Sequence, residues 1–147
     1  MKGCYFDAAY LAKCYVKEPD AAAVREVARS SKLVSSSAIS IAEVACVFHR
    51  HLREGALTAR MLGVLHDQFL DDVHETWVIL PVTELVLRKV GLAIRALPAS
   101  VFLRAADAIH IVTALDAGFE EIWTNDRRLL AAAAHFQLKG RQVSAAV

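Results

Sequence analysis

The sequence predicts an α/β fold in which helices flank a parallel β-sheet. Short apolar stretches typical of buried strands alternate with longer helical patterns, and this alternation favours parallel strands joined by right-handed crossovers. Hydrophobic residues make up 56% of the 147 residues and charged residues 22%, which is enough for one compact core. We find no internal repeat and no Pro/Gly-rich linker, so we expect one domain over residues 1–147.

The N-terminal half begins with the apolar stretch KGCYF, which we expect to form the first strand. Pro19 separates the next two helices, Asp20 is expected to cap the second of them, and Gly55 is expected to end a third. In chain order, the expected elements are a strand at 2–6, helices at 8–17 and 20–31, a buried strand at 32–37 and a helix at 39–55.

The C-terminal half contains the clearest strand, TWVILPV, because β-branched and aromatic residues dominate it. Thr58 and Thr83 are expected N-caps. The stretch 100–118 is apolar almost all round, so we expect a central buried helix that Gly118 ends. In chain order, the expected elements are a helix from 58 to about 74, a strand at 76–82, a helix at 83–97, a helix at 100–118, a strand at 120–125, a helix at 126–136 and a short strand near 142–143.

Composition and charge exclude some classes of protein. No charge-free run exceeds ten residues, which is too short to span a membrane. Asp7 interrupts what would be the apolar part of a signal peptide, so we expect a cytoplasmic protein. The net charge of +1 neither indicates nor excludes nucleic acid, and the basic segment 48–55 with Arg60 fits a nucleic-acid-binding edge and a solvated helix face about equally well.

Four acidic side chains occupy positions where a core-building sequence would favour leucine. Asp7 and Asp126 follow the strands at 2–6 and 120–125, and parallel sheets bind their ligands at this carboxyl edge. Glu43 and Asp107 interrupt apolar faces of two helices. The four acids are therefore expected to converge on one pocket.

Each acid also has a simpler explanation. Asp7 or Asp126 can cap the helix that follows it, Glu43 can pair with an arginine, and Asp107 can be held by Arg104. Convergent carboxylates, however, repel one another and raise each other's pKa unless a cation lies among them. Oxygen ligands without histidine or cysteine at ligand spacing suit Mg²⁺ or Mn²⁺ better than zinc. Such ions act mostly on phosphates, so the acids together predict metal-dependent chemistry on a phosphodiester.

Competing sites in the sequence are weaker. Acids and histidines near the end of one helix form a second candidate metal site, but we expect them to be solvated: His66, Asp67, Asp71, Asp72 and His74. His110 lies beside an apolar stripe and is expected to be a hydrogen-bonded core histidine. The sequence contains neither a glycine-rich phosphate loop nor a G-x-S-x-G nucleophile motif.

With these residues in place, the chain resembles PIN-domain proteins, and specifically VapC-type toxins of toxin–antitoxin pairs. The resemblance rests on YFDAAYLAK around Asp7, SSSAISIAEV around Glu43, LRAADAIHIVTAL around Asp107 and WTNDRRLL around Asp126. It spans essentially the whole chain, and the last two stretches are the most specific.

The resemblance implies a single PIN domain with a five-stranded parallel sheet flanked by helices. It implies a metal-dependent endoribonuclease that uses Mg²⁺ or Mn²⁺, cleaves RNA, forms a homodimer and is inhibited by a cognate VapB-like antitoxin. Asp7 and Asp107 are then expected to be direct metal ligands and Asp126 to complete the metal site, while Glu43 joins it or orients the attacking water. Ala8 and Ala9 stand where the family usually has Thr or Ser after the first Asp, which bears on metal affinity but leaves the acid set intact.

Two hypotheses from other classes compete with this one. The first is a catalytically silent PIN-like module that binds RNA or a protein, which the intact acid set disfavours. The second is a phospho-acceptor receiver domain, which needs adjacent acids after the first strand and a lysine after the last strand. Neither arrangement is present.

Overall fold

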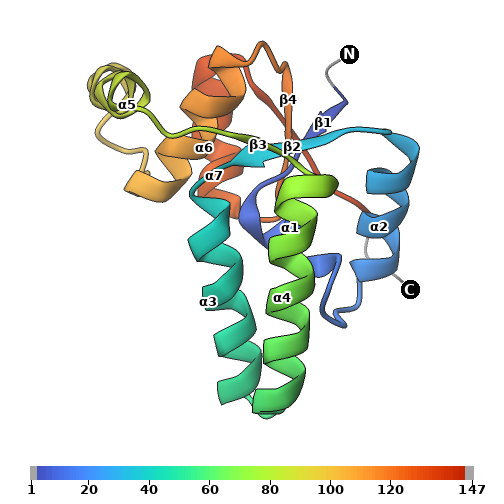
Figure 1. The fold of residues 1–147 in the computed structure, drawn as a ribbon. Helices are drawn as coiled ribbons and strands as arrows, with labels where there is room; N and C mark the ends of the chain where they lie inside the picture. Colours follow the sequence, from blue (N-terminus) through green and yellow to red (C-terminus); the bar gives the residue numbers. More distant parts are fainter. Residues whose placement is uncertain (1–2, 145–147) are drawn as a thin grey trace.

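The computed structural model describes residues 3–144, in which strands and helices alternate along the chain (Figure 1). Every strand pairing in this part of the chain is parallel. The predicted α/β class is therefore confirmed. The strands are β1 (Cys4–Tyr5), β2 (Val34–Ser37), β3 (Val78–Leu80), β4 (Glu121–Trp123) and β5 (Lys139–Arg141). The helices are α1 (Ala8–Lys13), α2 (Ala21–Ser30), α3 (Ser40–Arg53), α4 (Ala59–Glu75), α5 (Glu84–Ala96), α6 (Ala105–Asp116), α7 (Arg127–Ala133) and the 3₁₀ turn η1 (Ala134–Phe136).

The strands form two hydrogen-bonded ladders, β1-β2-β3 and β4-β5. A single parallel bridge between Phe6 and Trp123 joins β1 to β4, which gives the spatial order β3-β2-β1-β4-β5. The expected five parallel strands are thus present, but the two halves of the sheet meet through one bridge because β1 is only two residues long. The sheet twists strongly, so that β4 runs steeply against β2 and β3 in Figure 1.

The order of the strands fixes where a ligand can bind. From β1 the chain adds β2 and β3 on one side, and then returns to place β4 and β5 on the other. The connections therefore diverge at β1 and β4. Open α/β sheets bind their ligands at such a point, outside the carboxyl ends of the two strands, and we call this place the crevice between β1 and β4.

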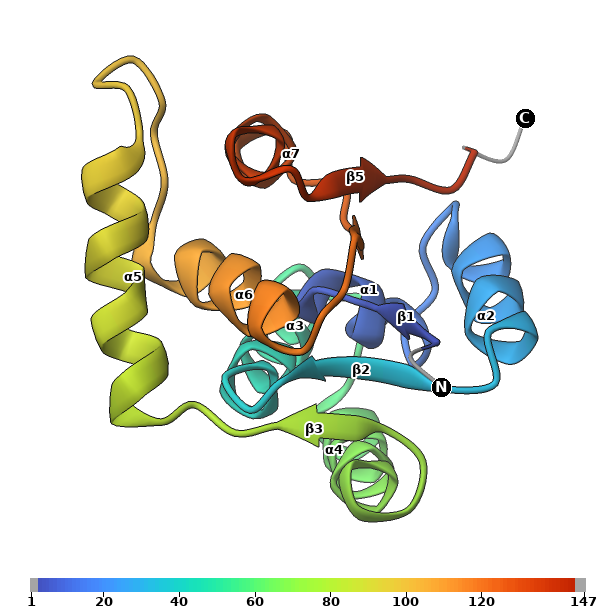
Figure 2. The same ribbon diagram turned by 90° about the horizontal axis from the view of Figure 1, so that it is seen from above.

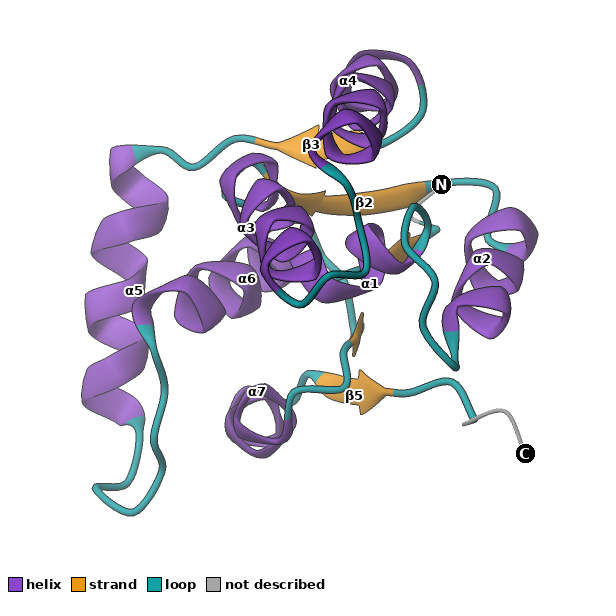
Figure 3. Ribbon diagram, turned by 90° about the horizontal axis from the view of Figure 1, so that it is seen from below, coloured by secondary structure: helices purple, strands orange, loops and turns teal. Residues whose placement is uncertain are grey.

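The helices cover the sheet on both sides and at its ends (Figures 2 and 3). α6 packs against β2, α1 packs against α3, and α5 packs across α6. α3 and α4 form a long hairpin that extends away from the sheet (Figure 1). None of the helices within residues 3–144 combines the length and the apolar character needed to cross a membrane.

The last residue of β1 and the residue that follows it belong to two different hydrophobic cores. Tyr5 packs with Ile111, Ile122 and other residues of α6, β4 and α7, whereas Phe6 packs with the cluster built by α1, α3 and α4. Both side chains are fully buried. This division follows from the strand itself, because successive side chains point to opposite faces of a sheet.

Several predicted element ends need correction. The first helix ends at Lys13 rather than at residue 17, and the last strand lies at 139–141 rather than near 142–143. Asp20 occupies the N-cap position of α2 but makes no capping bond, because its carboxylate accepts hydrogen bonds from Lys13 and Asn125 instead. The predicted caps at Thr58 and Thr83 are confirmed.

The largest difference concerns the predicted helix at 100–118, which begins only at Ala105. Residues 101–104 are not helical, and Val101 and Leu103 pack against the core while Phe102, between them, is 57% exposed. Gly118 has a φ of +80° just beyond the helix, as expected of a residue that ends one.

Candidate active site

Asp7 and Asp126 lie at the crevice between β1 and β4. The backbone N–H of Asp7 donates to the carbonyl oxygen of Trp123 at 3.1 Å, directly beyond the bridge that joins the two strands. Asp126 follows β4 after Thr124 and Asn125. The structure therefore places both acids at the predicted carboxyl edge.

Asp7 is a buried carboxylate and also a helix cap. Its Oδ1 accepts the backbone N–H of Tyr10 at 2.9 Å, and its exposure is 6%. Burial raises the pKa of Asp7 above its usual value, while the Thr124 hydroxyl, the Tyr10 N–H and the charge of His110 act in the opposite direction. The capping explanation of Asp7 is therefore correct, and this carboxylate also bears a desolvation cost that a cap at the protein surface does not.

Asp126 caps α7 in a more exposed position. Its Oδ1 accepts the backbone N–H groups of Arg128 and Leu129 at 2.8 and 3.2 Å, and its own N–H donates to Thr124 Oγ1 at 3.0 Å. Within residues 3–144, Oδ2 of Asp126 accepts no hydrogen bond. One oxygen therefore holds the helix while the other is available to a ligand.

Glu43 pairs with a histidine and not with the arginine suggested by the simpler explanation. His110 Nε2 lies 2.7 Å from Glu43 Oε1, and His110 Nδ1 lies 2.8 Å from the Tyr5 hydroxyl. Burial raises the pKa of Tyr5, with the nearby Asp7 and Glu43 charges adding to the shift, so the hydroxyl keeps its proton. A Tyr5 hydroxyl that donates to Nδ1 leaves the Nε2 proton of His110 facing Glu43.

Asp107 lies in the first turn of α6 and is partly buried. Burial, followed by the negative charge of Asp126, raises its pKa to about 6; Glu43 and Asp7 add smaller increments, and His110 opposes them. Neither carboxylate oxygen of Asp107 forms a hydrogen bond or an ion pair within the described chain, so the suggested Arg104 partner is wrong.

The structure thus brings the four acids into one electrostatic environment. Their carboxylate oxygens are hard donors, which are the ligands that Mg²⁺ and Mn²⁺ prefer, and several of these oxygens lack hydrogen bonds. Among residues 3–144, however, no three His, Cys, Asp or Glu side chains stand close enough together to form a ready metal cage. The residues fit a hard cation in chemistry, and binding would require their carboxylates to move closer together.

Sequence reasoning did not assign the residues that support these acids. His110 was expected to be a hydrogen-bonded core histidine, which is confirmed, but its link to Glu43 was not predicted. Ser36 donates to the carbonyl oxygen of Phe6 at 2.7 Å and lies 2.7 Å from Ser40, so it ties β2 and α3 to the end of β1. The run SSS before Glu43 could have indicated these hydrogen bonds, because consecutive buried serines need hydrogen-bond partners.

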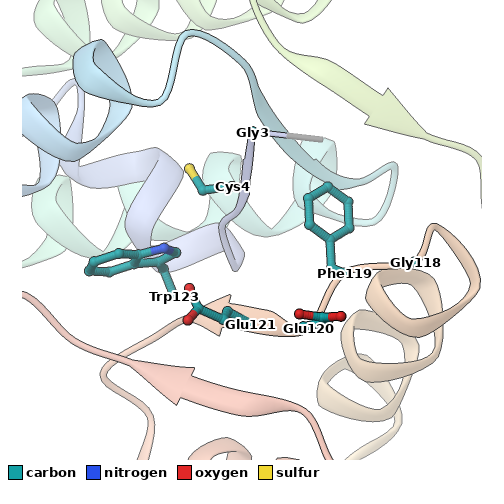
Figure 4. Close-up of a pocket in the computed structure, with 7 residues that line it drawn as sticks. All are labelled: Gly3, Cys4, Gly118, Phe119, Glu120, Glu121 and Trp123. Atoms are coloured by element: carbon teal, nitrogen blue, oxygen red, sulfur yellow. The ribbon is translucent and has the colours of Figure 1, made fainter. Parts of the chain in front are cut away.

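Two other regions within residues 3–144 do not form an equivalent site. A cavity of about 230 Å³ lies at the opposite, amino-terminal edge of β1 and β4, and none of the four acids lines it (Figure 4). In the alternative set on α4, Asp72 accepts hydrogen bonds from Tyr15 and Gln68, so it already has protein partners.

Because Asp7 is both a buried charge and a helix cap, we expect Asp7→Asn and Asp7→Ala to change the stability of the protein differently. Asp7→Asn keeps an oxygen at the cap and removes a buried charge, so in EDTA it should melt above the wild type by a few degrees. Asp7→Ala also loses the cap and should be less stable than Asp7→Asn by about 1 kcal/mol, or roughly 3 °C for a chain of this size. The measurement is thermal unfolding, with Asp126→Asn as an exposed capping control that should gain less. If Asp7→Asn melts below the wild type, the charge of Asp7 is structural.

The raised pKa of Asp107 predicts a pH dependence of stability. A carboxyl whose pKa is higher in the folded than in the unfolded chain destabilises the fold progressively as pH rises through about 4 to 6. Asp107→Asn removes this effect, so it should raise the melting temperature at pH 7.5 but not at pH 4. Asp67→Asn, an exposed change on α4, is the control and should leave the pH profile unaltered. A gain for Asp107→Asn that is equal at both pH values would contradict the assignment.

Comparisons with known proteins agree with this architecture. The model of the PIN domain family matches residues 4–135, which covers most of the chain. A search of curated proteins finds no significant match. Among solved structures, a chain of FitAB bound to an IR36 DNA fragment has the same fold, with a TM-score of 0.70 at 19% identity over 95% of this chain and 94% of that chain. The chain therefore belongs to the PIN domain family.

Proposed function

We propose that this protein is a metal-dependent endoribonuclease and the toxin of a VapC-type toxin–antitoxin pair. The observation that carries the proposal is that four carboxylates from separate elements share one electrostatic environment near the carboxyl ends of β1 and β4, where neighbouring charges help to raise the pKa of Asp107. Repulsion of this kind is expected where a cation normally lies among the acids. The family match supports the nuclease class.

The proposed cofactor is Mg²⁺ or Mn²⁺, held by Asp7, Asp107 and Asp126, with Glu43 as a fourth ligand or as the group that orients water. A divalent cation held there would supply charge that activates water and stabilises the leaving oxygen of a phosphodiester. Glu43 Oε1 is engaged by His110, and Oε2 accepts no hydrogen bond within residues 3–144. Oε2 is therefore the oxygen left to orient the attacking water.

The proposed partners are a cognate VapB-like antitoxin and a second copy of the chain. A groove of about 500 Å³ between the α3–α4 hairpin and the end of α1 supports an antitoxin, because apolar side chains line it and Lys17 and Arg60 lie beside them. The acidic crevice is also suited to an arginine from such a partner. Exposed apolar side chains on α5, such as Leu85 and Leu92, support self-association.

The direct test is cleavage of RNA by the purified protein. We expect cleavage with Mg²⁺ or Mn²⁺, its loss in EDTA, and a loss of roughly 100-fold or more for Asp107→Asn, because a ligand that positions the metal acts in the transition state. Asp67→Asn serves as the matched control and should cleave like the wild type. Cleavage by Asp67→Asn also tests whether the alternative acids on α4 take part in the reaction.

Two outcomes would contradict the proposal in different ways. Cleavage that persists in EDTA and in Asp107→Asn would show that the four acids do not carry the reaction. RNA binding without cleavage under any metal condition would favour the catalytically silent binding module instead.

A further inference from the structure

An aromatic side chain stands at the surface immediately before α6. Phe102 is 57% exposed, whereas Val101 and Leu103 on either side of it pack against the core. The outward position of Phe102 is thus fixed by its inward neighbours.

A guanidinium lies over this ring. The Cζ atom of Arg128, in the first turn of α7, lies 4.5 Å from the ring centroid of Phe102. This contact joins the segment before Asp107 to the residues just after Asp126. The pair therefore lies beside two of the four acids of the crevice.

Arginines without an acidic partner lie near the pair in the chain. Arg104, at the N-cap position of α6, and Arg127 and Arg128, at the start of α7, are all exposed. None of the three belongs to an ion pair in the described part of the chain, although four carboxylates lie close by. Unpaired arginines next to an exposed aromatic ring are the usual elements of a surface that binds a single nucleic-acid strand.

We propose that Phe102 and Arg128 form a stacking platform for an unpaired base of the RNA substrate, with Arg104 and Arg127 contacting the phosphates beside it. This proposal rests on the proposed nuclease function, because it assigns the strand that the acids would cut. The ring and the guanidinium plane offer a base a stacking surface that a paired base, enclosed in a helix, cannot reach. The platform therefore selects single-stranded RNA over duplex RNA.

Binding is tested apart from cleavage by placing every variant on the Asp107→Asn background. Fluorescence anisotropy with a labelled single-stranded RNA oligonucleotide should show binding about tenfold weaker for Phe102→Ala. Phe102→Tyr keeps the ring and should bind within about twofold of its parent. Leu70→Ala, a change at a side chain that is 36% exposed on α4, controls for lost apolar surface and should have no effect.

Two further measurements separate stacking from phosphate contact. The stacked position is found by moving one abasic nucleotide along the RNA strand. An RNA that is abasic at that position should bind the parent more weakly than the intact RNA does. Phe102→Ala should not weaken the binding of this abasic RNA any further. Arg104→Gln should instead lower the slope of log affinity against log salt by about one.

The proposal is overturned if Phe102→Ala binds single-stranded RNA as tightly as its parent does. It is also overturned if duplex RNA binds the parent as tightly as single-stranded RNA does and Phe102→Ala weakens both equally. It is also overturned if Phe102→Ala dissociates a dimer in size-exclusion chromatography, because the ring then belongs to an interface between copies. Cleavage by the otherwise wild-type protein is scored separately. A cleaving enzyme whose RNA binding ignores Phe102 refutes the platform alone, and a non-cleaving protein that passes the binding tests refutes the nuclease alone.

Discussion

The rest of the structure depends on a carboxylate that is buried where β1 meets β4. Asp7 is 6% exposed, and its N–H completes the short contact by which the two halves of the sheet are joined. A buried charge is tolerated only where its oxygens are hydrogen-bonded or a cation is near. The Tyr10 N–H supplies one partner, and Thr124, Tyr10 and His110 each lower the pKa of Asp7 and so offset part of the effect of burial. The carboxylate of Asp7 caps α1, and the backbone N–H of the same residue holds β4.

The same constraint links stability to the proposed function. Asp7 and Asp126 each use one oxygen to begin a helix, so the acids that raise the pKa of Asp107 are also structural. His110 holds Glu43 from a position that is almost fully buried and is itself held by Tyr5. Acidic side chains are thus fixed by the fold while they repel one another. This arrangement is expected of an active site that is maintained at a cost in stability.

The alternation of strands and helices, and the positions of the acids relative to these elements, could be predicted from the sequence because both depend on local patterns. Apolar strands, the caps at Thr58 and Thr83 and the glycine after α6 are signals carried by a few adjacent residues. The link between Glu43 and His110 joins residues 67 positions apart, so no local pattern could reveal it. The start of α6 was misjudged for a related reason. Residues 101–104 are as apolar as the helix that follows, and tertiary packing of Val101 and Leu103 decides that they do not join it.

The central claim is that Asp7, Glu43, Asp107 and Asp126 gather around one divalent cation, and anomalous diffraction from crystals grown with Mn²⁺ tests it most directly. The claim predicts an anomalous peak within ligand distance, about 2.1 Å, of at least two of these carboxylates, at the crevice between β1 and β4. The peak should be absent from Asp107→Asn crystals prepared in the same way. A peak at the acids and histidines of α4, with none at the crevice, would contradict the account.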